Sequence, residues 1–282
     1  MKKLIMAISF LIALSACKND KKENPENLNV APSVKVEEAD SSEISNINIT
    51  KDEEKTKEFP APLQSVFATH GGLAHWKAMN NLCFEMKGRN GRETHTISLP
   101  DRKTKIESKD WSIGYDGKGV WLLKHELGYQ GDPKFYHNLI FYFYAMPFII
   151  SDPGTNYEAL GPTELDGKMY NGYKVSYNQG VGTSPDDEYK LYFDPNTNKM
   201  AWLSYTVTFS DQKKNEDWHY IKYDKWQEVN GLLLPEKLVW YNVEKGKPKG
   251  KEMDIKFEKV TTTETMLDGS VFKKPAEAEY VQ

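Results

Sequence analysis

Alternating apolar and polar residues predict β-strands at several places after residue 80. In residues 82–87, the apolar Leu82, Phe84 and Met86 alternate with Cys83 and two charged side chains. Residues 200–209 and 253–259 follow the same two-residue period. Because successive side chains of a strand point to opposite faces of a sheet, each segment would turn one face to a core.

Pairs of Asn or Asp with Gly lie between such segments and predict tight turns. These pairs are Asn90-Gly91, Asp116-Gly117, Asp166-Gly167, Asn171-Gly172 and Asn230-Gly231. Both residues of such a pair tolerate the positive φ that two-residue hairpins require. Residues 194–198 are typical of a longer turn, and the lysine-rich residues 245–251 of a further hairpin tip. Strand after strand with short turns predicts an antiparallel meander.

Two segments break this pattern and predict helices. The first runs from about residue 63 to 79, where apolar residues recur at helical spacing and Gly71-Gly72 would break the helix in two. The second runs from about residue 134 to 145 and ends before Pro147, inside the stretch 135–151 that holds no charged residue. A helix that is apolar on almost every side must be covered. It either completes a solid core or covers an apolar cavity.

The N-terminus has the pattern of a lipoprotein signal peptide, residues 1–16. Lys2 and Lys3 precede an apolar segment, residues 4–14, that is too short to cross a bilayer. The exit, Leu14-Ser-Ala-Cys17, resembles the bacterial lipobox. That resemblance implies cleavage before Cys17 and acylation of this residue, whereas the alternative is an ordinary cleavable signal. By the same likeness, Lys18 favours the outer membrane, on its periplasmic or cell-surface face.

The residues that follow differ in composition from the rest of the chain. Residues 18–58 contain no aromatic residue and carry 7 Lys against 11 Asp and Glu. They can bury too little apolar surface to offset their chain entropy, so we expect residues 17–58 to form a disordered tether with a reach of roughly 35 Å.

Charge and cysteine content narrow the choice of function. The chain has a net charge of −4; loss of the two signal-peptide lysines gives −6, and the tether accounts for 7 − 11 = −4, which leaves −2 on residues 59–282. A nearly neutral domain argues against nucleic acid as a partner. With Cys17 acylated, Cys83 has no cysteine with which to form an internal disulfide.

Five phrases resemble, in order, those of the LolA/LolB superfamily of lipoprotein carriers. They are His70–Trp76 (HGGLAHW), Tyr115–Trp121 (YDGKGVW), Leu191–Thr197 (LYFDPNT), Tyr223–Pro235 (YDKWQEVNGLLLP) and Asp268–Pro275 (DGSVFKKP). The resemblance implies that residues 59–282 form a mainly β (α+β) domain. Its strongly curved antiparallel sheet would make an incomplete barrel, with helices plugging the concave side. The resemblance also implies an apolar pocket without catalytic residues. A closer likeness is to an uncharacterised lipoprotein family of Bacteroidota-type bacteria.

Catalytic and metal-binding motifs receive little support from the sequence. Its six histidines form no metal-ligand spacing, and it holds no nucleophile elbow, phosphate loop or dinucleotide fingerprint. Cys83 is a candidate nucleophile, although a strand cysteine more often packs inertly. The acidic residues 186–188 and the alternating Asp194, Asn196 and Asn198 lack the other ligands of a calcium loop, which favours solvated turns.

We therefore expect a monomeric, non-enzymatic lipoprotein that binds a lipid or acyl chain and uses no cofactor or metal. Its candidate ligand contacts lie along the apolar helix and on two tryptophans: Phe135, Leu139, Phe143, Met146, Phe148, Trp76 and Trp121. One alternative is a structural or interaction protein with a filled core, which would bind a partner through a sheet edge or an aromatic patch. A weaker alternative is an envelope hydrolase. The lysines of residues 245–251 either keep a loop soluble or dock on anionic lipid, at about 1 kcal/mol each.

Overall fold

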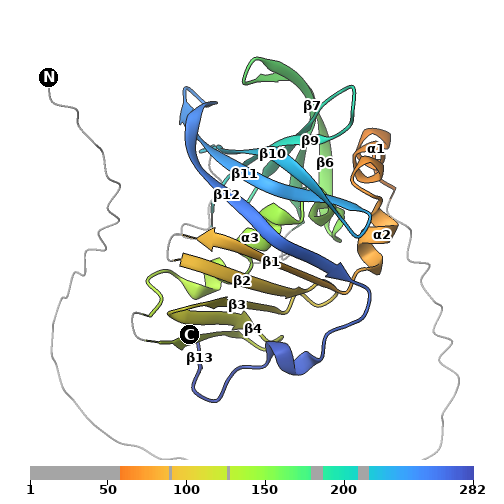
Figure 1. Ribbon diagram of the computed structural model, residues 1–282. Helices are drawn as coiled ribbons and strands as arrows, with labels where there is room; N and C mark the ends of the chain where they lie inside the picture. The colour runs from red at the N-terminus through yellow and green to blue at the C-terminus, as the bar shows by residue number, and fades with distance from the viewer. Residues whose placement is uncertain (1–57, 89–90, 126–127, 179–186, 209–215) are drawn as a thin grey trace, which may run out of the picture. The chain divides into compact units, whose positions relative to one another are not determined.

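The structure, a computed structural model, describes residues 58–88, 91–125, 128–178, 187–208 and 216–282 (Figure 1). The predicted signal peptide, the predicted acylation site Cys17 and almost all of the predicted tether lie outside the described residues, as do Asn90 and Asp186. In the part of the chain that is described, no helix has both the length and the apolar character needed to cross a bilayer.

Thirteen strands of the described residues form one antiparallel sheet, in the order β13-β5-β4-β3-β2-β1-β12-β11-β10-β9-β8-β7-β6. The first group comprises β1 (Asn81–Gly88), β2 (Gly91–Ser98), β3 (Thr104–Ser108), β4 (Trp111–Tyr115) and β5 (Val120–Lys124). The second comprises β6 (Thr155–Leu165), β7 (Lys168–Tyr177), β8 (Tyr189–Phe193), β9 (Met200–Tyr205), β10 (His219–Val229), β11 (Leu232–Glu244) and β12 (Lys247–Thr263). The short β13 (Glu279–Tyr280) pairs with β5 after the 3-10 turn η2 (Gly269–Phe272).

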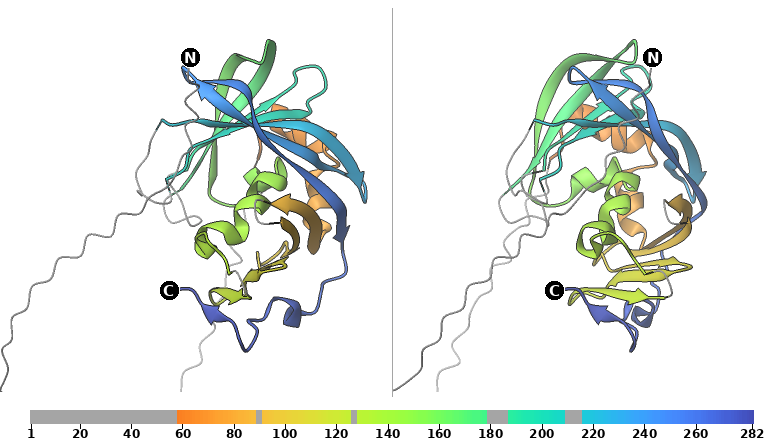
Figure 2. Two further views of the ribbon diagram at one scale, coloured as in Figure 1. Left: turned by 60° about the vertical axis from the view of Figure 1, so that its left-hand side comes forward. Right: turned by 90° about the vertical axis from the view of Figure 1, so that its left-hand side faces the viewer.

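The sheet is open, because its two outermost strands, β6 and β13, do not pair with each other. Figure 2 shows it curving around helix α3 (Pro133–Tyr144). This helix and the 3-10 turn η1 (Phe148–Ser151) carry the chain from β5, near one edge of the sheet, to β6 at the other. The predicted fold, a curved antiparallel sheet that forms an incomplete barrel with helices on its concave side, is confirmed.

Strand β12 joins the two groups of strands. It pairs with β11 from Lys247 to Lys256 and with β1 from Phe257 to Thr263. It is therefore the longest strand, 17 residues, and crosses from one group to the other in Figure 1. Beyond the end of β1 at Gly88, β12 continues beside β11 alone. Near Gly88, the pairing of β12 with β1 therefore ends, and β12 has a neighbouring strand on one side only.

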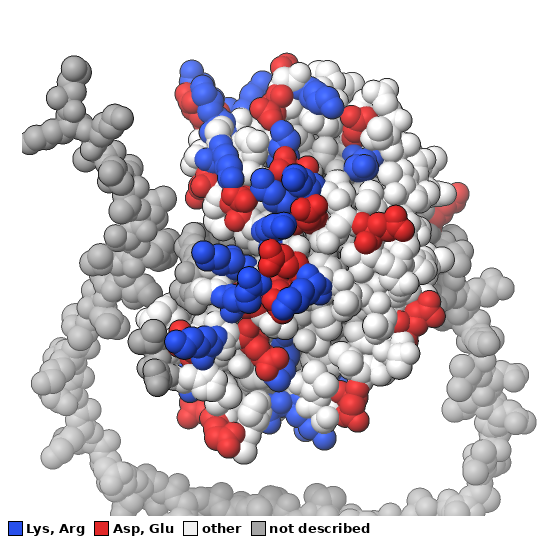
Figure 3. All heavy atoms as spheres, viewed as in Figure 1, with Lys and Arg blue, Asp and Glu red and all other residues white. Residues whose placement is uncertain are grey.

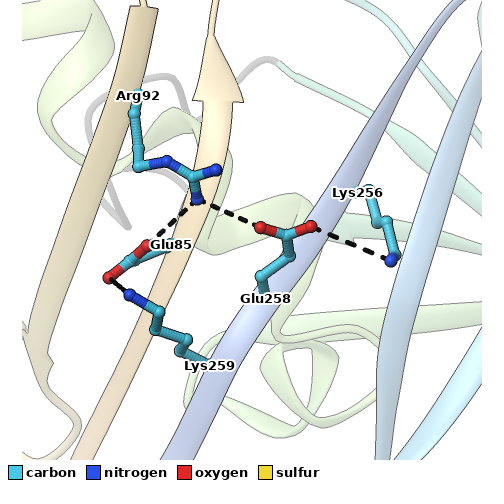
Figure 4. A network of polar contacts seen from close by, with 5 residues as sticks. All are labelled: Glu85, Arg92, Lys256, Glu258 and Lys259. Carbon is cyan, nitrogen blue, oxygen red and sulfur yellow. Dashed lines mark hydrogen bonds and ion pairs between the residues drawn. The ribbon is translucent and has the colours of Figure 1, made fainter.

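Charged side chains of both signs cover the outer face around β12, β1 and β2 (Figure 3). At the centre, Glu85 and Glu258 lie directly opposite each other in the β1–β12 register. Arg92 Nη1 lies 3.0 Å from a carboxylate oxygen of each, and Lys259 Nζ lies 2.8 Å from Glu85 Oε1 (Figure 4). Like charges opposite each other destabilise a strand pair, so these cations compensate for the two carboxylates.

The first predicted helix is indeed broken at Gly71-Gly72, into α1 (Ala61–Thr69) and α2 (Leu73–Ala78). Gly71 has a φ of +103°, and a Cβ there would lie 2.4 Å from the carbonyl oxygen of Gly231. The bend therefore lies directly against the β10–β11 turn. The preceding His70 holds the same place, because its backbone oxygen accepts a hydrogen bond from the amide of Leu233.

The second predicted helix is confirmed as α3, within one residue at each end. Asp132 caps its start, with Oδ1 accepting hydrogen bonds from the amides of Lys134 and Phe135, and Pro133 occupies the first turn. Near its end, the Tyr223 hydroxyl of β10 donates to the carbonyl oxygen of Phe143 over 2.6 Å. These contacts fix both ends of the crossing segment.

Most of the turn predictions hold. Asp166-Gly167 and Asn230-Gly231 are two-residue hairpin turns with positive φ at both positions, and Lys245-Gly246 forms the expected lysine-rich tip. Asn171-Gly172 is a wrong prediction, because it lies inside β7. A Cβ at Gly172 would lie 2.8 Å from the ring of Tyr192. This glycine leaves room for a neighbouring side chain and does not form a turn.

Candidate binding cleft

A cleft of about 770 Å³ lies on the concave side of the sheet, beside α3. It opens where β12 extends beyond the end of β1, so Met253 and Ile255 of β12 face it together with Met86 and Gly88 of β1. Its remaining lining comes from α3, from the segment before α3, from β2, from β9 and the residues just after it, and from β11: Phe135, Tyr136, Leu139, Ile140, Phe143, Tyr129, Gln130, Gly131, Glu93, Tyr205, Val207 and Trp240, with Lys87 and Asp254.

One wall of the cleft is apolar and is formed by one side of α3. Phe135, Leu139 and Phe143 are four residues apart, which places them one above another on the helix surface. The ring of Phe143 lies 4.8 Å from that of Tyr205 and 6.0 Å from that of Trp240. Leu139 is only half-buried, so this wall offers apolar surface that the protein's own side chains do not fully cover.

The cleft also contains a buried carboxylate. Glu93 lies on the concave face of β2 and is only 2% exposed. Its Oε2 atom accepts a hydrogen bond from the Tyr136 hydroxyl over 2.7 Å and lies 3.1 Å from His95 Nε2. His95 is not part of the cleft lining: its ring stacks 4.7 Å from that of Phe84, one strand away. Glu93 is therefore positioned by His95 of its own strand and by Tyr136 of α3.

Gly88 leaves room for the Glu93 side chain. A Cβ at Gly88 would lie 2.1 Å from Glu93 Oε1 and 2.8 Å from the carboxyl carbon. Any other residue at this position would force the carboxylate to move. Gly88 itself lines the cleft. Because Gly88 has no side chain, nothing at this position separates Glu93 Oε1 from the cleft.

Burial and the charge of Glu93 act together on the neighbouring tyrosines. Burial raises the pKa of Tyr136, and the negative charge of Glu93 and the hydrogen bond to it raise it further. The pKa of Tyr129 is raised as well, again by burial first and then by Glu93. Both hydroxyls therefore keep their protons at neutral pH and can donate hydrogen bonds.

Of the seven residues predicted to contact a ligand, three line the cleft together: Phe135, Leu139 and Phe143. Met146 does not, because α3 ends at Tyr144 and the helical spacing stops before it; its side chain lies in the core. Phe148 is also a core residue, and its ring stacks 4.8 Å from that of Trp76. Trp76 does not line this cleft either, because α2 packs on η1.

Trp121 is also absent from the lining of this cleft. Val120 packs with Trp111 in a cluster that contacts Tyr136 of α3. Strand alternation sends the next side chain, Trp121, to the opposite face of the sheet. There it pairs with Gly114, and its indole Nε1 donates to the carbonyl oxygen of Phe272 in η2 over 3.2 Å. The Trp121 side chain therefore packs on the C-terminal segment, on the face of the sheet opposite to the one that Val120 turns toward α3.

The sequence interpretation missed Glu93 and the role of Tyr136. A signal was present in the β1–β2 hairpin, where Gly88 pairs with Gly91, Met86 with Glu93 and Phe84 with His95. Extending the alternation of Leu82, Phe84 and Met86 across the turn would have placed Glu93 and His95 on the core face. A carboxylate and an imidazole in an otherwise apolar row mark a polar site.

The candidate nucleophile and calcium residues take structural roles. Cys83 lies between Thr96 and Thr261 on neighbouring strands, and burial raises the pKa of its thiol, which keeps it protonated. Asp194 Oδ1 accepts hydrogen bonds from the amides of Asn196 and Thr197, as expected for a turn. No group of three or more metal-ligating side chains occurs among the described residues.

These features define an open antiparallel half-barrel with an amphipathic cleft beside its inner helix. The segment that contains α3 and β6 to β12 is similar to a family of unknown function (DUF6503), whose model matches residues 132–266. No curated protein sequence matches this chain.

Two solved structures are similar over most of the β domain. A LolA superfamily protein from Nitrosomonas europaea is 9% identical, covers 75% of this chain and 97% of its own, and has a TM-score of 0.44. A DUF1329 family protein from Desulfovibrio piger is 10% identical, covers 75% and 97%, and has a TM-score of 0.46.

Proposed function

We propose that this protein is a lipid-anchored envelope protein that binds an apolar ligand, a lipid or an acyl chain, in the cleft beside α3 without chemical conversion. The observation that carries the proposal is the apolar wall of Phe135, Leu139 and Phe143 on a cleft of about 770 Å³. Clefts of this size are typical of small-molecule sites. The charge-free segment 135–151 thus has two roles: its second half fills the core and its first half lines the cleft.

The envelope location rests on the N-terminal sequence. A lipobox at Cys17 would supply two or more acyl chains, and two chains are enough for stable anchoring. With Lys18 at the next position we place the protein at the outer membrane. The likeness to a lipoprotein family of Bacteroidota-type bacteria stays a prediction of the same kind. An anchored protein suits a resident binder or a receptor better than a shuttle.

A non-catalytic role is supported by what surrounds the reactive groups. The Cys83 thiol is kept protonated, and His95 is covered by Phe84 and Glu93 instead of facing the cleft. A nucleophile needs an adjacent base and access to its substrate. Neither of these two groups has both.

The experiment measures uptake of a neutral apolar probe by the full chain carrying Cys17→Ser, which removes the acylation site. N-phenyl-1-naphthylamine should bind saturably at one site, and native mass spectrometry should show co-purified lipid. Leu139→Trp fills the cleft and should abolish uptake. Met266→Trp, at a 63% exposed position outside the cleft lining, is the matched control and should bind as before. If Leu139→Trp leaves uptake unchanged, or if the protein takes up no probe at all, the proposal is contradicted and an interaction protein with a filled core is favoured.

A further inference from the structure

We propose that the cleft selects amphipathic ligands whose head group donates hydrogen bonds, above all protonated long-chain amines, and that Glu93 is the residue that binds this head group. The inference rests on the proposed function, because it assigns the ligand class of the same cleft. Glu93 would bind the polar head group of the ligand, and the apolar wall of α3 would contact its hydrocarbon chain.

The hydrogen bonding of Glu93 leaves one oxygen to be satisfied. Oε2 has two partners, Tyr136 and His95, whereas Oε1 accepts no hydrogen bond from any described residue. Oε1 is not among the fully buried polar atoms that lack a partner, so it can be reached from the cleft, and a ligand that displaces water there loses least when it donates a hydrogen bond to this oxygen. Oε1 faces the cleft-lining Gly88. A ligand in the cleft can therefore provide the donor.

The charges of the cleft favour a cation or a neutral donor over an anion. Its charged lining residues are Lys87, Glu93 and Asp254. Asp254 already pairs with Lys251 and lies 3.9 Å from Lys237 Nζ, and Lys87 is exposed at the end of β1. No Lys or Arg among the described lining residues is buried beside Glu93. The buried His95, which is not in the lining, can form an ion pair with Oε2 at 3.1 Å, whereas Oε1 lies toward the cleft-lining Gly88. A carboxylate or phosphate head would meet Glu93 as a like charge at low dielectric, which is unfavourable.

Tyr136 lies between the buried carboxylate of Glu93 and the apolar wall of α3. Its hydroxyl donates to Glu93, while its ring packs near Trp111 and Tyr129, with centroids 6.1 and 5.8 Å away. The next turn of α3 carries Leu139 and Ile140, which line the cleft. A ligand whose head lies at Glu93 would therefore run its chain along the apolar side of α3.

The test compares three ligands that share one chain: dodecylamine, 1-dodecanol and dodecanoate. Each is titrated below its micelle concentration, by calorimetry at pH 7, into the full chain carrying Cys17→Ser. We expect dodecylamine to bind at least about tenfold more tightly than dodecanoate, as one charge-assisted hydrogen bond would give. Glu93→Gln should remove most of this ratio and change the affinity for dodecanol less than about threefold.

Gly88→Ala provides a second variant in case Glu93→Gln does not fold, which near-UV circular dichroism will show. The nearest atoms to the added methyl group are all in the Glu93 side chain, so this substitution should displace the carboxylate and reduce the amine preference as well. Equal or tighter binding of dodecanoate to the wild-type site overturns the inference, as does an amine preference that survives both variants.

The two proposals fail in distinguishable ways. If all three ligands bind equally and Leu139→Trp abolishes their binding, the apolar-ligand proposal stands and the head-group preference is wrong. If none of the three ligands binds, both are wrong.

Discussion

His70, at the bend between α1 and α2, has both ring nitrogens engaged by the backbone. Nδ1 donates to the carbonyl oxygen of Leu233 over 3.1 Å, and Nε2 accepts from the amide of Met200 over 3.1 Å. This arrangement requires the neutral ring. Burial lowers the pKa of His70 from 6.5 to about 4, with a smaller contribution from the positive charge of Lys199.

The pKa of His70 predicts a loss of stability in mild acid. Above pH 6.5 the ring is neutral in the folded and unfolded chains alike, so stability is complete. As the pH falls, the unfolded chain takes up a proton near 6.5 while the folded protein resists until about pH 4, and stability is lost over this interval. The loss is on the order of 3 kcal/mol.

Urea unfolding at pH 7.5, 5.5 and 4.5 measures this loss. A His70→Gln variant, without the titrating ring, should be less stable at pH 7.5 but should lose correspondingly less on acidification. His219→Gln, at an exposed position, is the control and should follow the wild type. Parallel pH profiles for the wild type and His70→Gln would rule out this role for His70.

Arg92 should be important because it separates two carboxylates that the strand register brings together. Arg92→Met leaves Glu85 opposite Glu258, so the midpoint of thermal unfolding should fall, and less so in high salt, which screens the repulsion. In a Glu258→Gln background the same substitution should have a smaller effect. Identical effects in the two backgrounds would show that the carboxylate pair is not the cause.

At the scale of elements, Gly71 and Gly72 offer a matched pair. Both have positive φ, +103° and +92°, but only Gly71 lies against the β10–β11 turn: a Cβ at Gly72 would meet nothing within 4 Å. Gly72→Ala should cost backbone strain alone, roughly 1–3 kcal/mol. Gly71→Ala adds the clash with Gly231 and should be clearly less stable in urea unfolding. Equal stability of the two variants would mean that the bend does not bear on the β10–β11 turn.

The elements that the sequence predicts well are those decided by local chemistry. The Gly71-Gly72 break, the end of α3 before Pro147 and the turns at Asp166-Gly167 and Asn230-Gly231 each follow from residues within a few positions of one another. Asn171-Gly172 has the same local chemistry but lies inside β7. There Gly172 makes room for Tyr192 of β8, which is far away in the sequence. Local turn chemistry cannot register such a contact.

The residues of the candidate site also fall into those that local spacing predicts and those that depend on distant elements. Helical spacing predicts that Phe135, Leu139 and Phe143 share one face, and they do. Whether an apolar residue lines a cleft or fills a core depends on elements far away in the sequence. Trp76 and Phe148, for example, are removed from the site by stacking on each other. Glu93 required the register of a hairpin, which single-strand periodicity does not supply.

At the scale of the whole protein, the anchor makes a prediction that is independent of the cleft. If Cys17 is acylated, the chain should sediment with outer membranes, and its mature mass should include the lipid. Cys17→Ala should release it to the soluble fraction with its binding of N-phenyl-1-naphthylamine unchanged. A wild-type chain that is soluble and unmodified would show that residues 1–16 act as an ordinary signal.

The partner exchange of β12 has a mechanical consequence. It carries backbone hydrogen bonds to β11 from Lys247 to Lys256 and to β1 from Phe257 to Thr263. The groups cannot open or close relative to each other without flexing this strand, which already bulges between Glu258 and Thr261. Because Met253 and Ile255 of this strand line the cleft, a change in the curvature of β12 would change the width of the cleft, and a stiff β12 would limit how thick a ligand can enter.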